Sequence, residues 1–211
     1  MTVRHTLRQG ECVESVAWIH GFLPDTLWLH ADNADLRTKR PDRHTLLAGD
    51  VLVIPDKRPR FEAKATEKRH RFLRRAVPAN VRIVLQDFEG KPRASLKYKA
   101  VIDGTEHAGQ TDSDGALELA IPPNARDGKL LLGERGAEVY HLELGGIDPI
   151  ETLSGGQQRL TNLGFACDST DGRLDDTTLT AIRQFQEQHQ LRATGKYDAA
   201  TRDKLKEIYG C

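Results

Sequence analysis

The sequence predicts a multi-domain α+β protein with an N-terminal βααβ unit, a central antiparallel β-sandwich and a C-terminal three-helix bundle. Apolar residues recur at helical spacing near both ends of the 211 residues, and short strand-like runs lie between them. Glycine, proline and aspartate cluster between those runs, as in tight turns. We therefore expect domains at 1–56, 76–147 and 148–211, with a basic linker or edge strand at 57–75.

The N-terminal region has the order strand, helix, helix, strand. Residues 3–7 alternate between apolar and polar, as in a half-buried strand. A helix is predicted over 13–20, because apolar residues recur there at helical spacing and Gly21 is a typical helix stop. Pro24 suits the first turn of a second helix. The run Leu46–Pro55 then predicts a turn and a buried strand that ends at the proline.

The middle region, 76–147, changes to short strand-like runs separated by turns, which predicts a small antiparallel sandwich. These runs are VRIVLQD, ASLKYKAVID, ALELAI, KLLLGE and VYHLEL. Helical spacing returns in the last region, where we expect helices at 157–164, 178–189 and 198–209.

Charge and hydropathy exclude several function classes. The chain balances 31 Lys and Arg against 31 Asp and Glu, so we expect no nucleic-acid partner. Residues 57–75 are locally basic, which fits either a solvated linker or an anion-binding strip. Apolar runs such as Val51–Ile54 are far shorter than the ~18–20 residues of a membrane span. The first residues contain no apolar stretch of signal-peptide length, so we expect synthesis in the cytoplasm.

No residue pattern indicates catalysis, a metal or a cofactor. Residues 153–159 spell Leu-Ser-Gly-Gly-Gln-Gln-Arg, the signature loop of ABC-type ATPases, but that loop only completes a nucleotide site built on GxxxxGK[ST]. None of the Gly-Lys pairs in this chain is followed by Ser or Thr. The eight histidines form no HxxxH, HExxH or HxH pair. We therefore expect a protein that is not an enzyme, with no catalytic residue, metal or cofactor.

Two stretches in the N-terminal region, His5–Val13 and Leu47–Pro55, resemble a LysM domain. Glu11 replaces the usual Asp of that family, and Cys12 replaces a hydroxyl residue. The resemblance implies binding of N-acetylglucosamine polymers, such as peptidoglycan, in a groove between two loops. The second of these loops, 31–45, is enlarged. The groove residues that the resemblance implies are Gly10, Glu11, Cys12 and Val13 on one side, with Asn33 and Leu36 on the other.

The C-terminal region is similar to the three-helix peptidoglycan-binding domain found beside many wall hydrolases. About sixty residues carry this resemblance in order. The matches include Gln157–Leu160, Leu163–Phe165, Asp171-Gly172, Thr178, Ala181-Ile182, Phe185-Gln186, Thr194-Gly195, Thr201 and Leu205. The resemblance implies a second module that binds peptidoglycan.

The central region resembles a transthyretin-like or carboxypeptidase-regulatory-like sandwich through Gly90–Pro92 and Thr111–Gly115. The combination of three modules resembles proteins of contractile injection systems, which are type VI secretion and phage-tail-like machines. It implies a non-enzymatic adaptor with spike, tail or effector proteins as partners, delivered by the machine to the periplasm or cell wall. The alternative, motivated by Glu11 and Cys12, is a structural or protein-recognition component whose modules no longer bind glycan.

The three cysteines, Cys12, Cys167 and Cys211, show no zinc spacing. Cys167 and Cys211 lie at opposite ends of the C-terminal module, where a compact bundle would bring them close enough for a disulfide. We predict this Cys167–Cys211 bridge, with Cys12 left free. Two buried thiols are the alternative.

Overall fold

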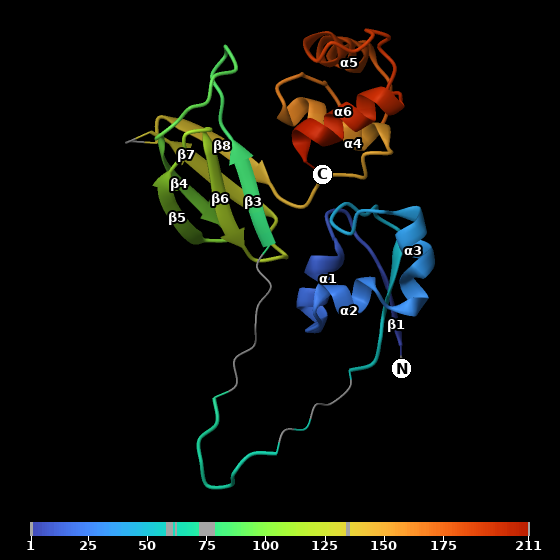
Figure 1. The fold of residues 1–211 in the computed structure, drawn as a ribbon, viewed down its shortest axis with the longest axis vertical. Coiled ribbons are helices and arrows are strands. Elements are labelled where there is room, and N and C mark those ends of the chain that lie inside the picture. Colours follow the sequence, from blue (N-terminus) through green and yellow to red (C-terminus); the bar gives the residue numbers. More distant parts are fainter. Residues whose placement is uncertain (1, 58–60, 62, 72–78, 134–135, 211) are drawn as a thin grey trace.

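The computed structural model describes residues 2–57, 61, 63–71, 79–133 and 136–210, which form three compact regions and an extended connection (Figure 1). Helices and antiparallel sheets are both present, so the predicted mixed α+β class is confirmed. No helix in the described ranges is long and apolar enough to cross a membrane.

The N-terminal unit pairs its first and last strands, with helices between them. The strands are antiparallel, with Val3 opposite Ile54. The predicted first helix ends as expected, because Gly21 adopts φ +71° beyond its last turn. The predicted loop 31–45 is partly wrong, since it contains a 3₁₀ turn and a third helix. The elements are β1 (Val3–Thr6), α1 (Val13–His20), α2 (Pro24–Trp28), η1 (Ala31–Asn33), α3 (Ala34–Lys39) and β2 (Val51–Ile54).

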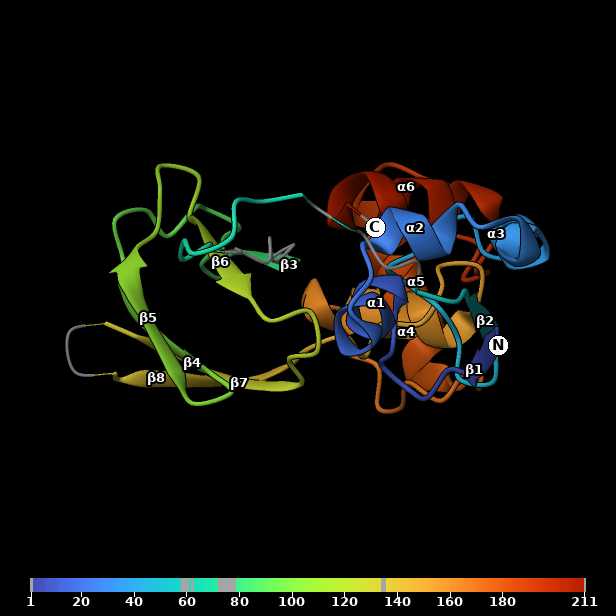
Figure 2. The same cartoon turned by 90° about the horizontal axis from the view of Figure 1, so that it is seen from below.

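The central region is a sandwich of two antiparallel sheets (Figure 2). Strands β3 and β6 form one sheet, and the other has the order β5-β4-β7-β8. Apolar side chains such as Leu119, Leu130 and Ile102 fill the space between the sheets. The sequence did not predict strand β5, because its residues, TEHAGQ, do not alternate between apolar and polar. The bounds are β3 (Ala79–Val84), β4 (Lys97–Ile102), β5 (Thr105–Gln110), β6 (Ala116–Ile121), β7 (Asp127–Leu132) and β8 (Glu138–Glu143).

The C-terminal region contains the three predicted helices, α4 (Leu153–Asn162), α5 (Asp176–Gln188) and α6 (Ala199–Tyr209). Each helix begins at a side-chain cap. Thr152, Asp175 and Asp198 accept hydrogen bonds from the backbone N–H groups of Gly155, Thr178 and Thr201. Helices α4 and α5 begin at residues 153 and 176, earlier than the predicted 157 and 178, because the caps set their first residues. The core contains Leu160, Phe165, Ala181, Ile182, Phe185 and Leu205.

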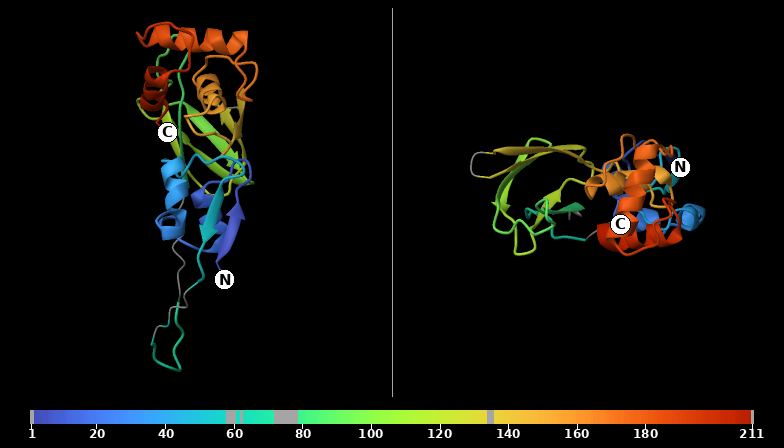
Figure 3. Two further views of the ribbon diagram at one scale, coloured as in Figure 1. Left: turned by 90° about the vertical axis from the view of Figure 1, so that its right-hand side faces the viewer. Right: turned by 90° about the horizontal axis from the view of Figure 1, so that it is seen from above.

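The C-terminal helices lie over one end of the N-terminal unit, and the sandwich lies beside both (Figures 1 and 3). The described residues 63–71, between β2 and β3, lie away from this body (Figure 1). Within the predicted linker or edge strand, 57–75, the described residues 57, 61 and 63–71 form no helix or strand. Residues 58–60, 62 and 72–75 lie outside the described residues.

Two glycines in the first turn of α4 allow the chain to pack closely on itself. A Cβ atom on Gly155 would lie 2.6 Å from the carbonyl oxygen of Asp148 and would also clash with the carbonyl of Pro149. A Cβ atom on Gly156 would clash with the ring of Tyr197. The paired glycines therefore serve packing at this helix start, as expected for a chain that lacks the other parts of a nucleotide site.

We predict that Gly155→Ala destabilises the C-terminal region by about 1–3 kcal/mol, the usual cost of overpacking. Hydrogen exchange of the α4 amides measures this loss of local stability. Gly146→Ala is the matched control, because a Cβ atom there meets nothing within 4 Å. Equal exchange rates in the two variants would contradict the assignment of Gly155 to close backbone packing.

Candidate functional site

The residues of the predicted glycan groove do not form one exposed surface. Val13 and Leu36 belong to the N-terminal core, where they are 0% and 8% exposed. Asn33 is also buried, at 1%. The structure therefore places three of the six predicted side chains in the interior, away from a ligand on the surface.

Asn33 holds strand β2 to the helices. Its Nδ2 donates to the carbonyl oxygens of Leu27 and Val53, and its Oδ1 accepts from the N–H of Val53, each at 2.8 Å. Every polar group of this buried amide is used within the fold. The structure gives Asn33 the role of a structural cross-link in place of the predicted glycan contact, because its side chain is buried and both of its N–H donors are used within the fold.

Glu11 and Cys12 stabilise the turn before α1. The Glu11 carboxylate contacts His5 Nε2 at 2.8 Å and accepts from the N–H of Arg8 at 2.9 Å. Burial raises the pKa of Glu11, but these hydrogen bonds outweigh it and hold the pKa below its usual value. Cys12 is the N-cap, and its N–H donates to Ser15 Oγ at 2.9 Å. Burial raises the pKa of the Cys12 thiol, which keeps it protonated near neutral pH.

Gly10 lies where the N-terminal unit meets the sandwich. Its carbonyl oxygen accepts a hydrogen bond from Arg126 Nη1, 116 residues further along the chain. A Cβ atom on Gly10 would also lie 3.0 Å from the carbonyl oxygen of Gly145. The loop that the resemblance assigns to sugar binding therefore packs against other parts of the same chain.

Asp148 joins that loop to the start of the C-terminal region. Its Oδ1 accepts from Gln9 Nε2 at 3.0 Å, and its Oδ2 accepts from Ser154 Oγ at 2.6 Å. Its N–H donates to Gln158 Oε1 at 2.7 Å, and its carbonyl accepts from Arg159 Nη1 at 2.8 Å. Asp148 is buried, and all of its polar groups are satisfied. We call this set of contacts, together with Arg126–Gly10, the junction.

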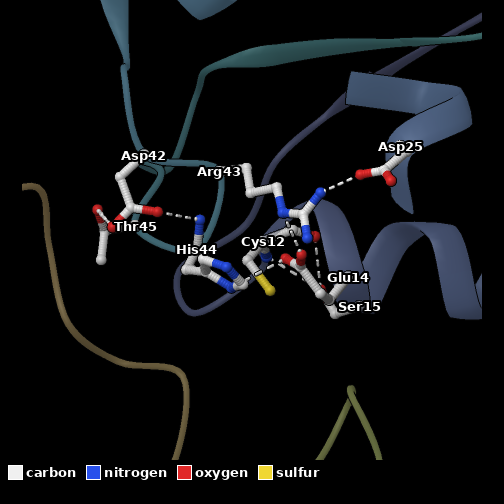
Figure 4. A network of polar contacts seen from close by, with 8 residues as sticks. All are labelled: Cys12, Glu14, Ser15, Asp25, Asp42, Arg43, His44 and Thr45. Carbon is white, nitrogen blue, oxygen red and sulfur yellow. Dashed lines mark hydrogen bonds and ion pairs between the residues drawn. The ribbon is translucent and has the colours of Figure 1, made fainter. Parts of the chain in front are cut away.

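The loop 40–45 beside the junction is fixed by charged contacts (Figure 4). Glu14 on α1 is buried and lies 2.8 Å from Arg43 Nε and 3.3 Å from His44 Nδ1. Arg43 also pairs with Asp25. Asp42 accepts from the N–H of His44 at 2.8 Å. The contacts of Arg43 and His44 tie the loop to α1 and α2 of the N-terminal unit.

Asp50 fixes the start of the same loop from the other side. It is buried and accepts from Lys39 Nζ at 2.7 Å and from Arg40 Nε at 2.8 Å. Burial raises the pKa of Asp50, but the hydrogen bonds from Arg40 and Lys39 outweigh it and lower the pKa below its ordinary value.

A shallow hollow, open to solvent, lies between the N-terminal unit and the C-terminal region. Arg40, Pro41, Asp42 and Thr45 line one wall. The segment 149–151 and Lys206 of α6 line the other. This hollow is the candidate site, because both regions contribute charged side chains to it and the junction holds its two walls together.

The C-terminal helices are linked by two equivalent polar clusters. Gln157 on α4 donates to Thr178 Oγ1 at 2.9 Å and accepts from the N–H of Gly172 at 2.8 Å. Gln186 on α5 donates to Thr201 Oγ1 at 2.8 Å and accepts from the N–H of Gly195 at 2.9 Å. Each cluster fastens a loop to the helix before it and to the helix after it.

A short internal repeat, which the sequence analysis did not identify, underlies the two clusters. Both segments have the pattern GxxDxxT, over 172–178 and 195–201, with the Asp as helix cap. The pattern is visible in the sequence, but it is too short to stand out without the two buried glutamines that it serves.

A family model described as "Putative peptidoglycan binding domain" matches residues 153–205. The predicted peptidoglycan-binding domain is therefore present. No curated protein and no solved structure matches the chain. The candidate hollow lies at the edge of this domain, since Lys206 follows the last matched residue directly.

Cys167 of the peptidoglycan-binding domain does not line the candidate site. Cys167 is half-buried, with Sγ 3.9 Å from the carbonyl oxygen of Phe165, and burial raises its pKa. Cys12 and Cys167 do not pair with each other. Cys211 lies outside the described residues, so the Cys167–Cys211 disulfide stays a prediction.

We predict that the N-terminal unit loses stability above neutral pH, because His44 then loses its charge and its stabilising contact with Glu14. The hydrogen bond to Glu14 raises the pKa of His44 above its ordinary 6.5. The stabilisation is therefore full below pH 6.5 and is lost as the pH rises through the raised pKa. The loss stays below about 1 kcal/mol, because a half-exposed ion pair is screened by solvent.

Urea unfolding followed by tryptophan fluorescence measures this effect, because both tryptophans, Trp18 and Trp28, lie in the N-terminal unit. The stability of the wild type should fall between pH 6.5 and 8 more than that of His44→Ala. Parallel pH profiles would show that the His44–Glu14 contact contributes nothing.

Proposed function

We propose that the protein binds peptidoglycan without catalysis, through its C-terminal domain. The family match to residues 153–205 carries this proposal. The matched residues form a three-helix domain in which the buried polar side chains of Gln157 and Gln186 are used internally. The ligand therefore has to be recognised by groups on the surface of the domain.

The N-terminal unit supports in part the alternative of a structural component whose modules no longer bind glycan. Asn33 and Leu36 are buried, and the Gly10 loop packs on the sandwich. We propose that this unit has a structural role and does not bind glycan as a separate module. Its loop 40–45 then contributes to recognition only together with the peptidoglycan-binding domain.

The wider role is also a proposal. We propose an adaptor or accessory protein of a contractile injection system, made in the cytoplasm and delivered to the periplasm or cell wall. Spike, tail or effector proteins would be its protein partners. The combination of the three sequence resemblances supports this role, and co-purification with such a protein would test it.

We predict that the full chain sediments with insoluble peptidoglycan at low salt and leaves the turbidity of the suspension unchanged. Gly146→Ala should sediment as the wild type does, because a Cβ atom there meets no other group. Gly155→Ala should bind less, because it distorts the start of the peptidoglycan-binding domain.

Wild-type protein that remains in the supernatant would contradict peptidoglycan binding. A steady fall in turbidity, with release of soluble fragments, would contradict the proposal that no bond is cleaved.

A further inference from the structure

We propose that the hollow between the N-terminal unit and the peptidoglycan-binding domain binds the charged peptide part of peptidoglycan. This inference rests on the proposed function and specifies which part of the polymer is recognised. It also gives the N-terminal unit a place in the site, since Arg40 and Asp42 form part of one wall.

Charged groups of both signs line the hollow. Arg40 and Lys206 are the cations, and Asp42 and Glu151 are the anions. Cross-linking peptides of peptidoglycan bear both carboxylate and amino groups, whereas an N-acetylglucosamine unit is neutral. Lys and Arg bind carboxylates through charge-assisted hydrogen bonds, and carboxylates bind ammonium groups in the same way. The charges of the hollow therefore match a peptide better than a sugar.

Lys206 and Glu151 are available for a ligand. Both side chains are exposed, and within the described ranges neither forms an ion pair. Lys204, two residues earlier on the same helix, is instead paired with Glu207 at 2.8 Å. The two lysines therefore differ in availability although they have the same charge and lie on the same helix.

The walls of the hollow are held before a ligand arrives. Arg40 is fixed by Asp50, with Nε 2.8 Å from the carboxylate. Pro41 and Pro149 restrict the backbone on either side. The Gln9–Asp148 contact links the two regions across the junction. Preformed walls reduce the entropy that binding has to overcome.

The lining of the hollow favours a peptide over a sugar. None of its lining residues is aromatic, so it offers no ring on which a sugar could stack. A short chain with a free carboxylate can reach Lys206, while the attached glycan stays outside.

Isothermal titration calorimetry with two soluble probes tests this inference on the full chain. One probe is the N-acetylglucosamine–N-acetylmuramic acid disaccharide with a tripeptide that has free carboxylates. The other is a peptide-free N-acetylglucosamine oligomer. We expect the wild type to bind the first probe more tightly. Lys206→Ala should weaken that binding about tenfold, as for loss of one charge-assisted hydrogen bond. Lys204→Ala, the matched control, should bind as the wild type does.

The outcomes separate this inference from the proposed function. If the chain sediments with peptidoglycan but prefers the peptide-free oligomer, peptide recognition is wrong and peptidoglycan binding stands. Equal binding by Lys206→Ala and Lys204→Ala would remove the hollow as the site. If the chain fails to sediment at all, the proposed function itself is wrong. Amidation of the tripeptide carboxylates should abolish the difference between the two lysine variants.

Discussion

The buried carboxylate of Asp148 determines how the parts of this protein are placed. A buried charge is costly unless hydrogen bonds satisfy it, and here Gln9 and Ser154 supply them from two different regions. Asp148 also precedes α4, so the residue that contacts the N-terminal loop lies next to the start of the peptidoglycan-binding domain. The loop 40–45 and α6 then face each other across the candidate hollow as a consequence of these contacts.

The peptidoglycan-binding domain uses its recognisable residues to hold itself together. A domain of this size buries only about 60% of its unfolded surface, so satisfied polar contacts matter for its stability. Gln157 and Gln186 each connect a glycine turn and a threonine near a helix start. We therefore propose that recognition falls to surface residues such as Lys206, which directly follows the matched segment and lines the hollow with residues of the N-terminal unit.

Local chemistry determined what could be predicted from the sequence. Gly21 marked the end of α1, and helical spacing located α5 and α6 to within a few residues. The polar strand β5 and helix α3 have weak local patterns, and they form because neighbouring elements pack on them. The candidate site was beyond prediction, because its walls come from residues 40–45, 149–151 and 206, and nothing in these distant segments indicates that they meet. Likewise, the burial of Asn33 follows from its bonds to Val53 and Leu27, which no spacing reveals.

The central claim is that the N-terminal unit and the peptidoglycan-binding domain form one body that shares a ligand site. Residual dipolar couplings of backbone amides in the full chain test it most directly, because they report the orientation of each region relative to one common frame. The account predicts that one alignment tensor fits the couplings of residues 3–54 and 153–205 together, with the orientation seen in the structure. Two tensors of different magnitude or direction would show that the regions move independently, and would contradict a composite site.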